Sequence, residues 1–196
     1  MKTLKELRLA DSALCGDLGP LGVLPCLRIL DAGNTKVTDC HLRSLSKSVS
    51  IVELYLRHCE CTDDFLPLTR MRTLNVLHLV GFTAKALNVD KLNRLSSLSA
   101  LRLKGDAVTD ESLQELCNGL SLSSLDISGC SKLTDVSPLR QIKALEEINL
   151  HKCVKLISGV TCLLELPFLR RVTMPSERNY YSSGDKFHER GIAINY

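Results

Sequence analysis

A repeat of 23 or 24 residues runs through most of this chain and constrains its fold more than any other feature. The spacings between the apolar residues that open successive units are 23, 24, 23, 24, 24, 23 and 24 residues. These opening residues are Leu4, Leu27, Ile51, Leu74, Leu98, Leu122, Leu145 and Leu169. A unit this short cannot bury its own apolar face, so the period predicts a stack of similar units that share one continuous core.

Each unit begins with apolar residues at its first, fourth and sixth positions, as in Leu122, Leu125 and Ile127. In a β-strand, successive residues point to opposite faces, and residues two positions apart share a face. Positions four and six are therefore expected to face the core, and positions three, five and seven to face outward. Eight such strands, each followed by a connecting segment, predict an α/β protein with one curved parallel sheet.

The connecting segments are short. The clearest helix is expected over Thr109–Gly119, because a threonine cap and an acidic first turn precede leucines at helical spacing. A similar pattern starts at Thr38, whereas the segments from Thr134 and around Leu68 predict one or two helical turns.

The period and the L-x-x-L-x-L pattern together resemble the leucine-rich repeat. This resemblance implies a solenoid of eight units of 23–24 residues, of a mixed cysteine-containing and short-helix subtype. Its curved parallel sheet would lie on the concave side, with short helices and turns on the convex side. Part of the chain is similar to trypanosome leucine-rich-repeat proteins of the expression-site-associated and adenylate-cyclase-regulator group. The similarity lies in the stretches LDISGCSKLTDVSPL, INLHKCVKLISGV and LPFLRRV with FHERGIAI. That group implies protein binding or regulation and supplies no catalytic residues.

Position nine of the units carries small polar or thiol side chains, where the chain is expected to turn off the strand. The column contains Ser12, Thr35, Cys59, Phe82, Asp106, Cys130 and Cys153. A thiol or hydroxyl can hydrogen-bond backbone groups in such a turn, so these cysteines are interpreted as part of the scaffold. Phe82 departs from the pattern and predicts a local distortion in the fourth unit.

The two ends of the repeat differ. Residues 1–176 are predicted to form the leucine-rich-repeat domain, without an N-terminal cap, and residues 177–196 a C-terminal cap. The cap is expected to consist of a loop, a short helix near Asp185–Arg190 and an edge strand at Ile192–Asn195. Tyr180 and Tyr181 are expected either to pack in this cap or to contact a partner. The exposed N-terminal end suggests a missing upstream domain or a covering subunit.

Composition excludes several classes of function. The chain has nine cysteines, an odd number, and no apolar leader segment. This combination predicts free thiols in a reducing intracellular compartment, the cytoplasm. No apolar run is long enough to insert into a membrane. The sequence contains no phosphate-binding, nucleophile-elbow or metalloprotease motif, so no enzymatic activity and no cofactor are predicted.

The stretch HCEC at His58–Cys61 invites a test for zinc. Structural zinc requires four converging ligands, usually in two spaced pairs, and no second pair is aligned with this one. The sequence therefore predicts no metal site.

Candidate binding residues lie at the outward positions of the middle units. They are Tyr55, Arg57, His58, His78, Arg102 and Lys104. Such a cluster would complement an acidic surface of a protein partner, with Tyr and Arg as anchors. The chain is thus interpreted as a non-catalytic protein-interaction module: a scaffold, adaptor or regulatory subunit. Two alternatives remain open: a face that is merely solvated, and an RNA-associated structural subunit of a large assembly that uses the basic central strands.

Overall fold

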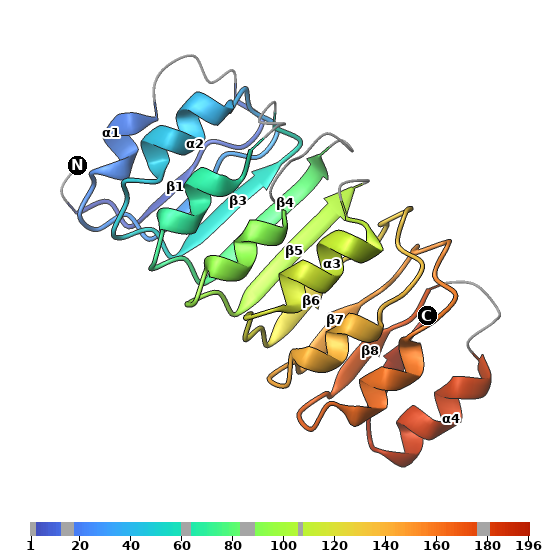
Figure 1. The fold of residues 1–196 in the computed structure, drawn as a ribbon. Helices are drawn as coiled ribbons and strands as arrows, with labels where there is room; N and C mark the ends of the chain where they lie inside the picture. The colour runs from blue at the N-terminus through green and yellow to red at the C-terminus, as the bar shows by residue number, and fades with distance from the viewer. Residues whose placement is uncertain (1–2, 13–17, 60–63, 83–88, 106–107, 176–180) are drawn as a thin grey trace.

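The structure is a computed structural model. Its described residues form a single sheet of nine parallel strands, which lie side by side in the order of the sequence (Figure 1). The structure describes residues 3–12, 18–59, 64–82, 89–105, 108–175 and 181–196, excluding the side chains of residues 82 and 181–184. The strands are β1 Glu6–Arg8, β2 Ile29–Asp31, β3 Glu53–Arg57, β4 Val76–Phe82, β5 Ala100–Gly105, β6 Ser124–Asp126, β7 Glu147–Asn149, β8 Arg171–Thr173 and β9 Ala193–Asn195. The predicted α/β class and parallel sheet are confirmed.

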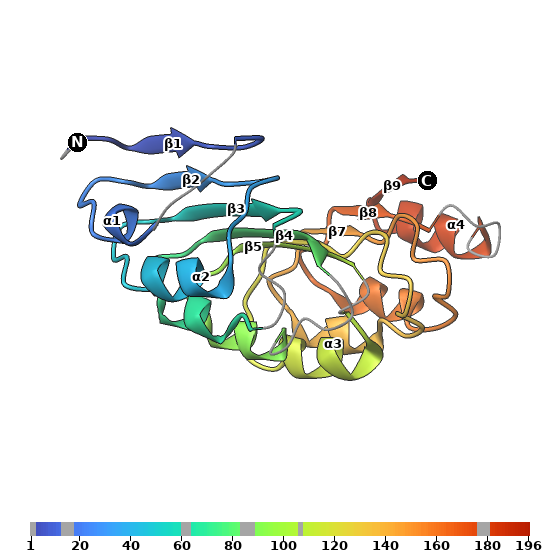
Figure 2. The same ribbon diagram turned by 90° about the horizontal axis from the view of Figure 1, so that it is seen from above.

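The register of the sheet follows the repeat. Position four of each unit lies opposite position four of the next, from Leu7 against Leu30 to Ile148 against Val172. The last pair is Val172 against Ile194 on β9, beyond the eighth unit. In Figure 2 the open sheet follows an arc, with the two termini at its opposite ends. A constant period therefore produces a constant register, because each strand pairs only with the units before and after it.

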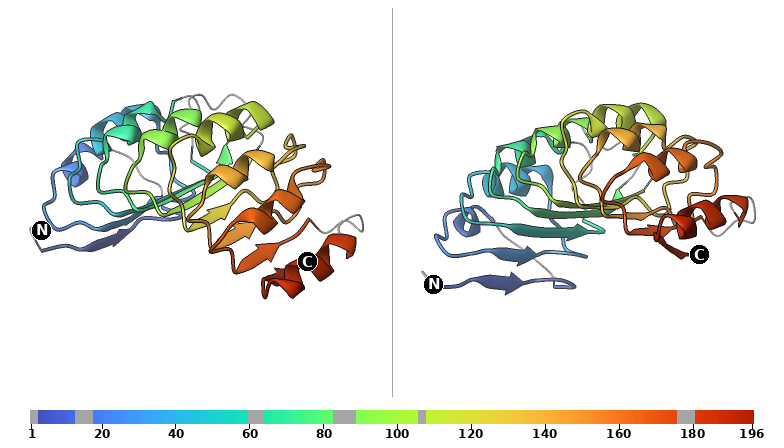
Figure 3. Two further views of the ribbon diagram at one scale, coloured as in Figure 1. Left: turned by 60° about the horizontal axis from the view of Figure 1, so that its bottom comes forward. Right: turned by 90° about the horizontal axis from the view of Figure 1, so that it is seen from below.

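Short helices cover the convex side of this arc (Figure 3). The α-helices are α1 Gly19–Gly22, α2 Asp39–Leu45, α3 Asp110–Cys117 and α4 Tyr181–Glu189. The 3₁₀ helices are η1 Leu66–Arg70, η2 Asp90–Arg94, η3 Ser137–Gln141 and η4 Val160–Glu165. The helix expected at Thr109 is confirmed and begins with a capping box: the Ser112 backbone N–H donates to Thr109 Oγ1 (3.2 Å), and the Thr109 N–H donates to Ser112 Oγ (2.9 Å).

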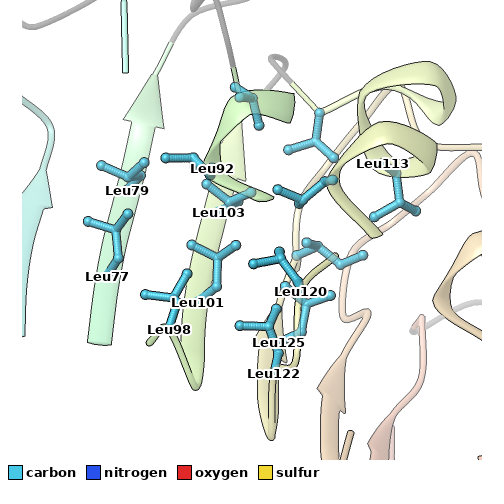
Figure 4. Packing of buried hydrophobic residues seen from close by; sticks show 14 of the residues in the cluster. Leu77, Leu79, Leu92, Leu98, Leu101, Leu103, Leu113, Leu120, Leu122 and Leu125 are labelled. Carbon is cyan, nitrogen blue, oxygen red and sulfur yellow. The ribbon is translucent and has the colours of Figure 1, made fainter. Parts of the chain in front are cut away.

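The core consists of stacked leucines between the sheet and the convex segments. Leu77, Leu101 and Leu125 occupy equivalent places on three neighbouring strands (Figure 4). Each is at most 2% exposed, as are Leu92 and Leu113 from the convex side. Burying one leucine contributes roughly 1.5–3 kcal/mol, so these layers are the main source of stability.

A left-handed residue stands at position eight of the first seven units. Its φ is 61° at Asp11, 53° at Asn34, 52° at His58, 82° at Gly81, 140° at Gly105, 73° at Gly129 and 60° at Lys152. In six of these units the residue lies at the end of the strand or just beyond it and turns the chain away. In the fourth unit Gly81 lies inside β4, next to the shift in register between Val80 and Phe82. The sequence offered only a weak signal for it, because four of the seven residues are not glycine.

The three cysteines at position nine hydrogen-bond to the neighbouring unit through their thiols. Cys59 Sγ donates to Ala32 O (3.1 Å) and Cys153 Sγ to Ile127 O (3.2 Å), both carbonyls at position six of the preceding unit. Cys130 Sγ makes the same contact with Leu103 O at 3.5 Å. The cysteines thus connect adjacent units, whereas Thr35 donates to Ala32 O in its own unit (2.6 Å).

The fourth unit is irregular, as Phe82 predicted. The register between β4 and β5 shifts between Val80 and Phe82. At the C-terminus, α4 and β9 lie where a helix and an edge strand were expected, and Phe187 and Ile192 are buried against the last layer of the core.

Candidate functional site

The concave side of the sheet carries five of the six candidate residues. Tyr55 and Arg57 lie on β3, His78 on β4, and Arg102 and Lys104 on β5. Tyr55 is opposite His78, and His78 is opposite Arg102, in the strand register. The parallel ladder therefore brings these side chains onto three adjacent strands of one face.

Tyr55 and His78 form an aromatic pair at the centre of this face. Their ring centroids are 4.7 Å apart, and the ring planes are 81° apart, in an edge-to-face arrangement. The Tyr55 hydroxyl donates to Glu53 Oε2 at 2.6 Å, which fixes the tyrosine ring along the sheet. The pair lies in an open hollow of about 310 Å³, whose lining is Arg8, Ile29, Asp31, Glu53, Tyr55, Arg57, His78 and Arg102.

The surroundings of this pair shift both pKa values. Burial raises the pKa of Tyr55 to about 12, and the hydrogen bond to Glu53 adds to the shift. Burial lowers the pKa of His78, and the positive charges of Arg102 and Arg57 lower it further. At neutral pH the two rings are therefore uncharged, and the centre of the face is an aromatic surface with hydrogen-bonding groups.

The cations around the pair have acidic partners. Arg57 Nη2 lies 3.1 Å from Asp31 Oδ2, and Arg102 Nε lies 2.7 Å from Asp126 Oδ2. Lys104 Nζ is 3.9 Å from the same carboxylate oxygen of Asp126. The face is thus charge-balanced rather than basic. Sequence analysis missed this role of Asp126, although its place at position five, one unit after Arg102, was a usable signal.

His58 lies apart from the other candidates. It occupies the left-handed turn after β3, and its ring packs over Gly81, where an added Cβ would lie 2.2 Å from His58 Nδ1. Tyr180 lies outside the described residues, and so does the side chain of Tyr181. A binding role for these three residues stays a prediction.

The described part of the chain contains no group of three or more His, Cys, Asp or Glu residues that could hold a metal ion. Cys61, the last residue of the HCEC stretch, lies outside that part. Burial raises the pKa of the Cys117 thiol to about 12 and that of Cys162 to about 11, and it also raises the pKa of Cys153. A raised pKa makes a thiol a poor nucleophile, which agrees with a structural role. None of the helices described here is long and apolar enough to span a bilayer.

Comparison with solved structures identifies the architecture. The leucine-rich-repeat protein LIC12759 of Leptospira interrogans aligns with a TM-score of 0.72 and 19% identity over 100% of this chain and 49% of its own. Internalin C2 of Listeria monocytogenes aligns with a TM-score of 0.58 and 24% identity over 88% of this chain and 71% of its own. The fold is a leucine-rich-repeat solenoid.

Two further comparisons bear on function. The plant peptide hormone receptor RGFR1, solved in complex with RGF2, aligns with a TM-score of 0.56 and 16% identity over 90% of this solenoid and 33% of the receptor. In sequence, a Trypanosoma equiperdum protein that bears the name of an adenylate cyclase regulatory protein is 27% identical over 146 residues. The match covers 74% of this solenoid and 23% of the trypanosome protein, so the chain spans less than a quarter of that relative. No family model matches the chain.

Proposed function

We propose that this solenoid is a non-catalytic protein-interaction module that binds its partner through the concave face of β3, β4 and β5. The observation that carries the proposal is the aromatic pair of Tyr55 and His78 in the hollow, with ion pairs on both sides of it. Tyrosine and arginine in such a setting supply most of the binding energy at protein interfaces.

The structural neighbours and the regulatory name of the trypanosome relative support the class of function. A leucine-rich-repeat receptor solved with a bound peptide hormone shows that this architecture accommodates a polypeptide ligand. The proposal for this chain is accordingly a regulatory or adaptor role, with a folded or peptidic partner.

The second interpretation, RNA binding by the basic central strands, loses its physical basis in the observed ion pairs. Arg57 pairs with Asp31, and Arg102 and Lys104 share Asp126, so phosphate groups would have to compete with those carboxylates. RNA binding depends on cations that are free to displace counterions.

Affinity capture from native extract, with quantitative mass spectrometry, tests the proposal. The double variant Tyr55→Ala with His78→Ala removes the aromatic surface and leaves the ion pairs in place. It should reduce capture of the specific partner about tenfold or more, as expected for hot-spot residues. A second double variant, Arg57→Glu with Arg102→Glu, should also abolish capture.

The matched control is Arg140→Glu with Lys143→Glu, which reverses two exposed charges on the convex side of the sixth unit. Circular dichroism verifies that all variants are folded. The concave-face proposal would be refuted if both concave variants captured as much partner as the control variant and the wild type.

A further inference from the structure

A second hollow, on the convex side, lies between α2 and η1 of the second and third units. Its volume is about 340 Å³, and its lining is Arg43, Lys47, Asp64, Leu66, Pro67 and Arg70. The sheet separates it from the concave face, since α2 and η1 lie on the other side of the strands (Figure 2). The hollow is therefore independent of the site described above.

The charge of this hollow is unbalanced. Arg43, Lys47 and Arg70 are exposed, and none of them forms an ion pair with a residue that the structure describes. Among the residues that the structure describes, Asp64 is the single acidic group of the lining, and its Oδ1 accepts the backbone N–H of Leu66 at 2.8 Å. Three cations against one engaged carboxylate favour an anionic partner, in contrast to the charge-balanced concave face.

An apolar surface lies among these cations. Leu66 is 39% exposed although it adjoins the buried residues Phe65 and Leu68. Its place is fixed by the bond from its N–H to Asp64, by Pro67 in the first turn of η1, and by Thr69 Oγ1, which donates to Leu66 O at 2.7 Å. The backbone of Leu66 is therefore held in place before a ligand arrives, so binding there costs little backbone conformational entropy.

The combination of charge and apolar surface discriminates among anionic ligands. A phosphate ion, a nucleic-acid backbone or a lipid headgroup would engage the cations but leave Leu66 uncovered. An acidic peptide segment with an aliphatic side chain would engage both, because carboxylates pair with Arg and Lys while the aliphatic group excludes water from Leu66.

We propose that the hollow between α2 and η1 docks an acidic segment of a protein partner, with an aliphatic side chain against Leu66 and carboxylates on Arg43, Lys47 and Arg70. The acidic helix α3 of a second copy is not such a segment. It exposes Glu111 and Glu115 but buries its leucines, so this helix offers no aliphatic group for Leu66. Together with the concave surface proposed above, the convex hollow would give the solenoid two separate docking surfaces.

Fluorescence anisotropy with a labelled peptide tests this proposal on the full chain. The probe is a heptapeptide with one central leucine and glutamate at the other positions, and the comparison probe has serine in place of the leucine. The leucine peptide should bind more tightly, and NMR should place its chemical-shift changes at Arg43, Lys47, Leu66 and Arg70. The double variant Arg43→Glu with Arg70→Glu should weaken binding about tenfold or more, and Leu66→Ser should abolish the preference for leucine.

Arg140→Glu with Lys143→Glu, on the same convex side, is the matched control and should leave peptide affinity unchanged. Equal affinity of the two peptides would overturn the proposal, and so would equal weakening by the control variant. A simple anion site would also overturn the proposal. Its signature is a wild-type protein that does not bind the peptides but binds inorganic phosphate or phosphatidylserine vesicles, and loses that binding in Arg43→Glu with Arg70→Glu. Sedimentation experiments test for self-association of the chain. Self-association that Arg43→Glu with Arg70→Glu abolishes would overturn the proposal and assign the hollow to a second copy of the chain.

Discussion

Two glycines separate the cost of a left-handed backbone from the cost of close packing between units. Gly129 has a φ of 73°, and a Cβ built there would meet nothing within 4 Å. Gly159 has a φ of 86°, but its Cβ would lie 2.2 Å from Ser137 N, 2.5 Å from Asp135 Oδ1 and 2.7 Å from Val136 C. Because two of these three atoms belong to the backbone of the preceding unit, they cannot move aside cheaply.

The expected magnitudes follow from this difference. Gly129→Ala should lower the free energy of unfolding by about 1–2 kcal/mol, the cost of a left-handed L-residue. Gly159→Ala should carry the same cost plus about 1–3 kcal/mol of overpacking, for a total of roughly 2–5 kcal/mol. Marginal stability of about 5–15 kcal/mol makes both losses measurable.

Urea denaturation monitored by circular dichroism measures these losses, and hydrogen exchange locates them. The excess loss in Gly159→Ala should be concentrated in the contact of Asp135, Val136 and Ser137 with the segment around Ser158, where the Val136 N–H donates to Ser158 O (3.3 Å). Equal losses of stability in the two variants would refute the inference that the backbone of the preceding unit packs closely against Gly159.

Two more predictions concern titration and thiol reactivity. The pKa of His78 is lower in the folded state than the value of about 6.5 in the unfolded state, so its stabilising contribution is complete above that unfolded pKa and is lost as pH falls toward the lower folded pKa. In urea titrations at stepped pH, wild type should therefore lose stability in acid more steeply than His78→Gln. Parallel slopes of stability against pH would contradict this. The thiol experiment uses a variant background with Cys15→Ser and Cys61→Ser. In the native protein, Ellman's reagent should modify the exposed Cys40 rapidly, and it should modify the four buried thiols only after unfolding. Rapid reaction of Cys117 in the native protein would contradict its raised pKa. The buried thiols are those of Cys59, Cys117, Cys130 and Cys153.

Much of the candidate site was predictable from the repeat, because position in a unit determines the face on which a residue lies. Tyr55, His78 and Arg102 share position five, and the register aligns them on adjacent strands. His58 shows the limit of this reasoning. It follows directly after an outward position, yet its φ of 52° takes it off the strand. Histidine is enriched among left-handed residues, but a single histidine is a weak signal for that conformation in the sequence.

The sequence by itself determined the solenoid, the strand order, the register and the leucine layers. These features depend on contacts between a unit and its immediate neighbours, so a regular period is sufficient to specify them. Only the tertiary structure decided that Asp31 and Asp126 pair with the concave cations, and that Arg43, Lys47 and Arg70 surround Leu66 without an ion pair to any residue that the structure describes. The reason is physical: charge pairing and surface hollows depend on side-chain torsions and on the small rotation from one unit to the next, and neither leaves a periodic mark on the chain.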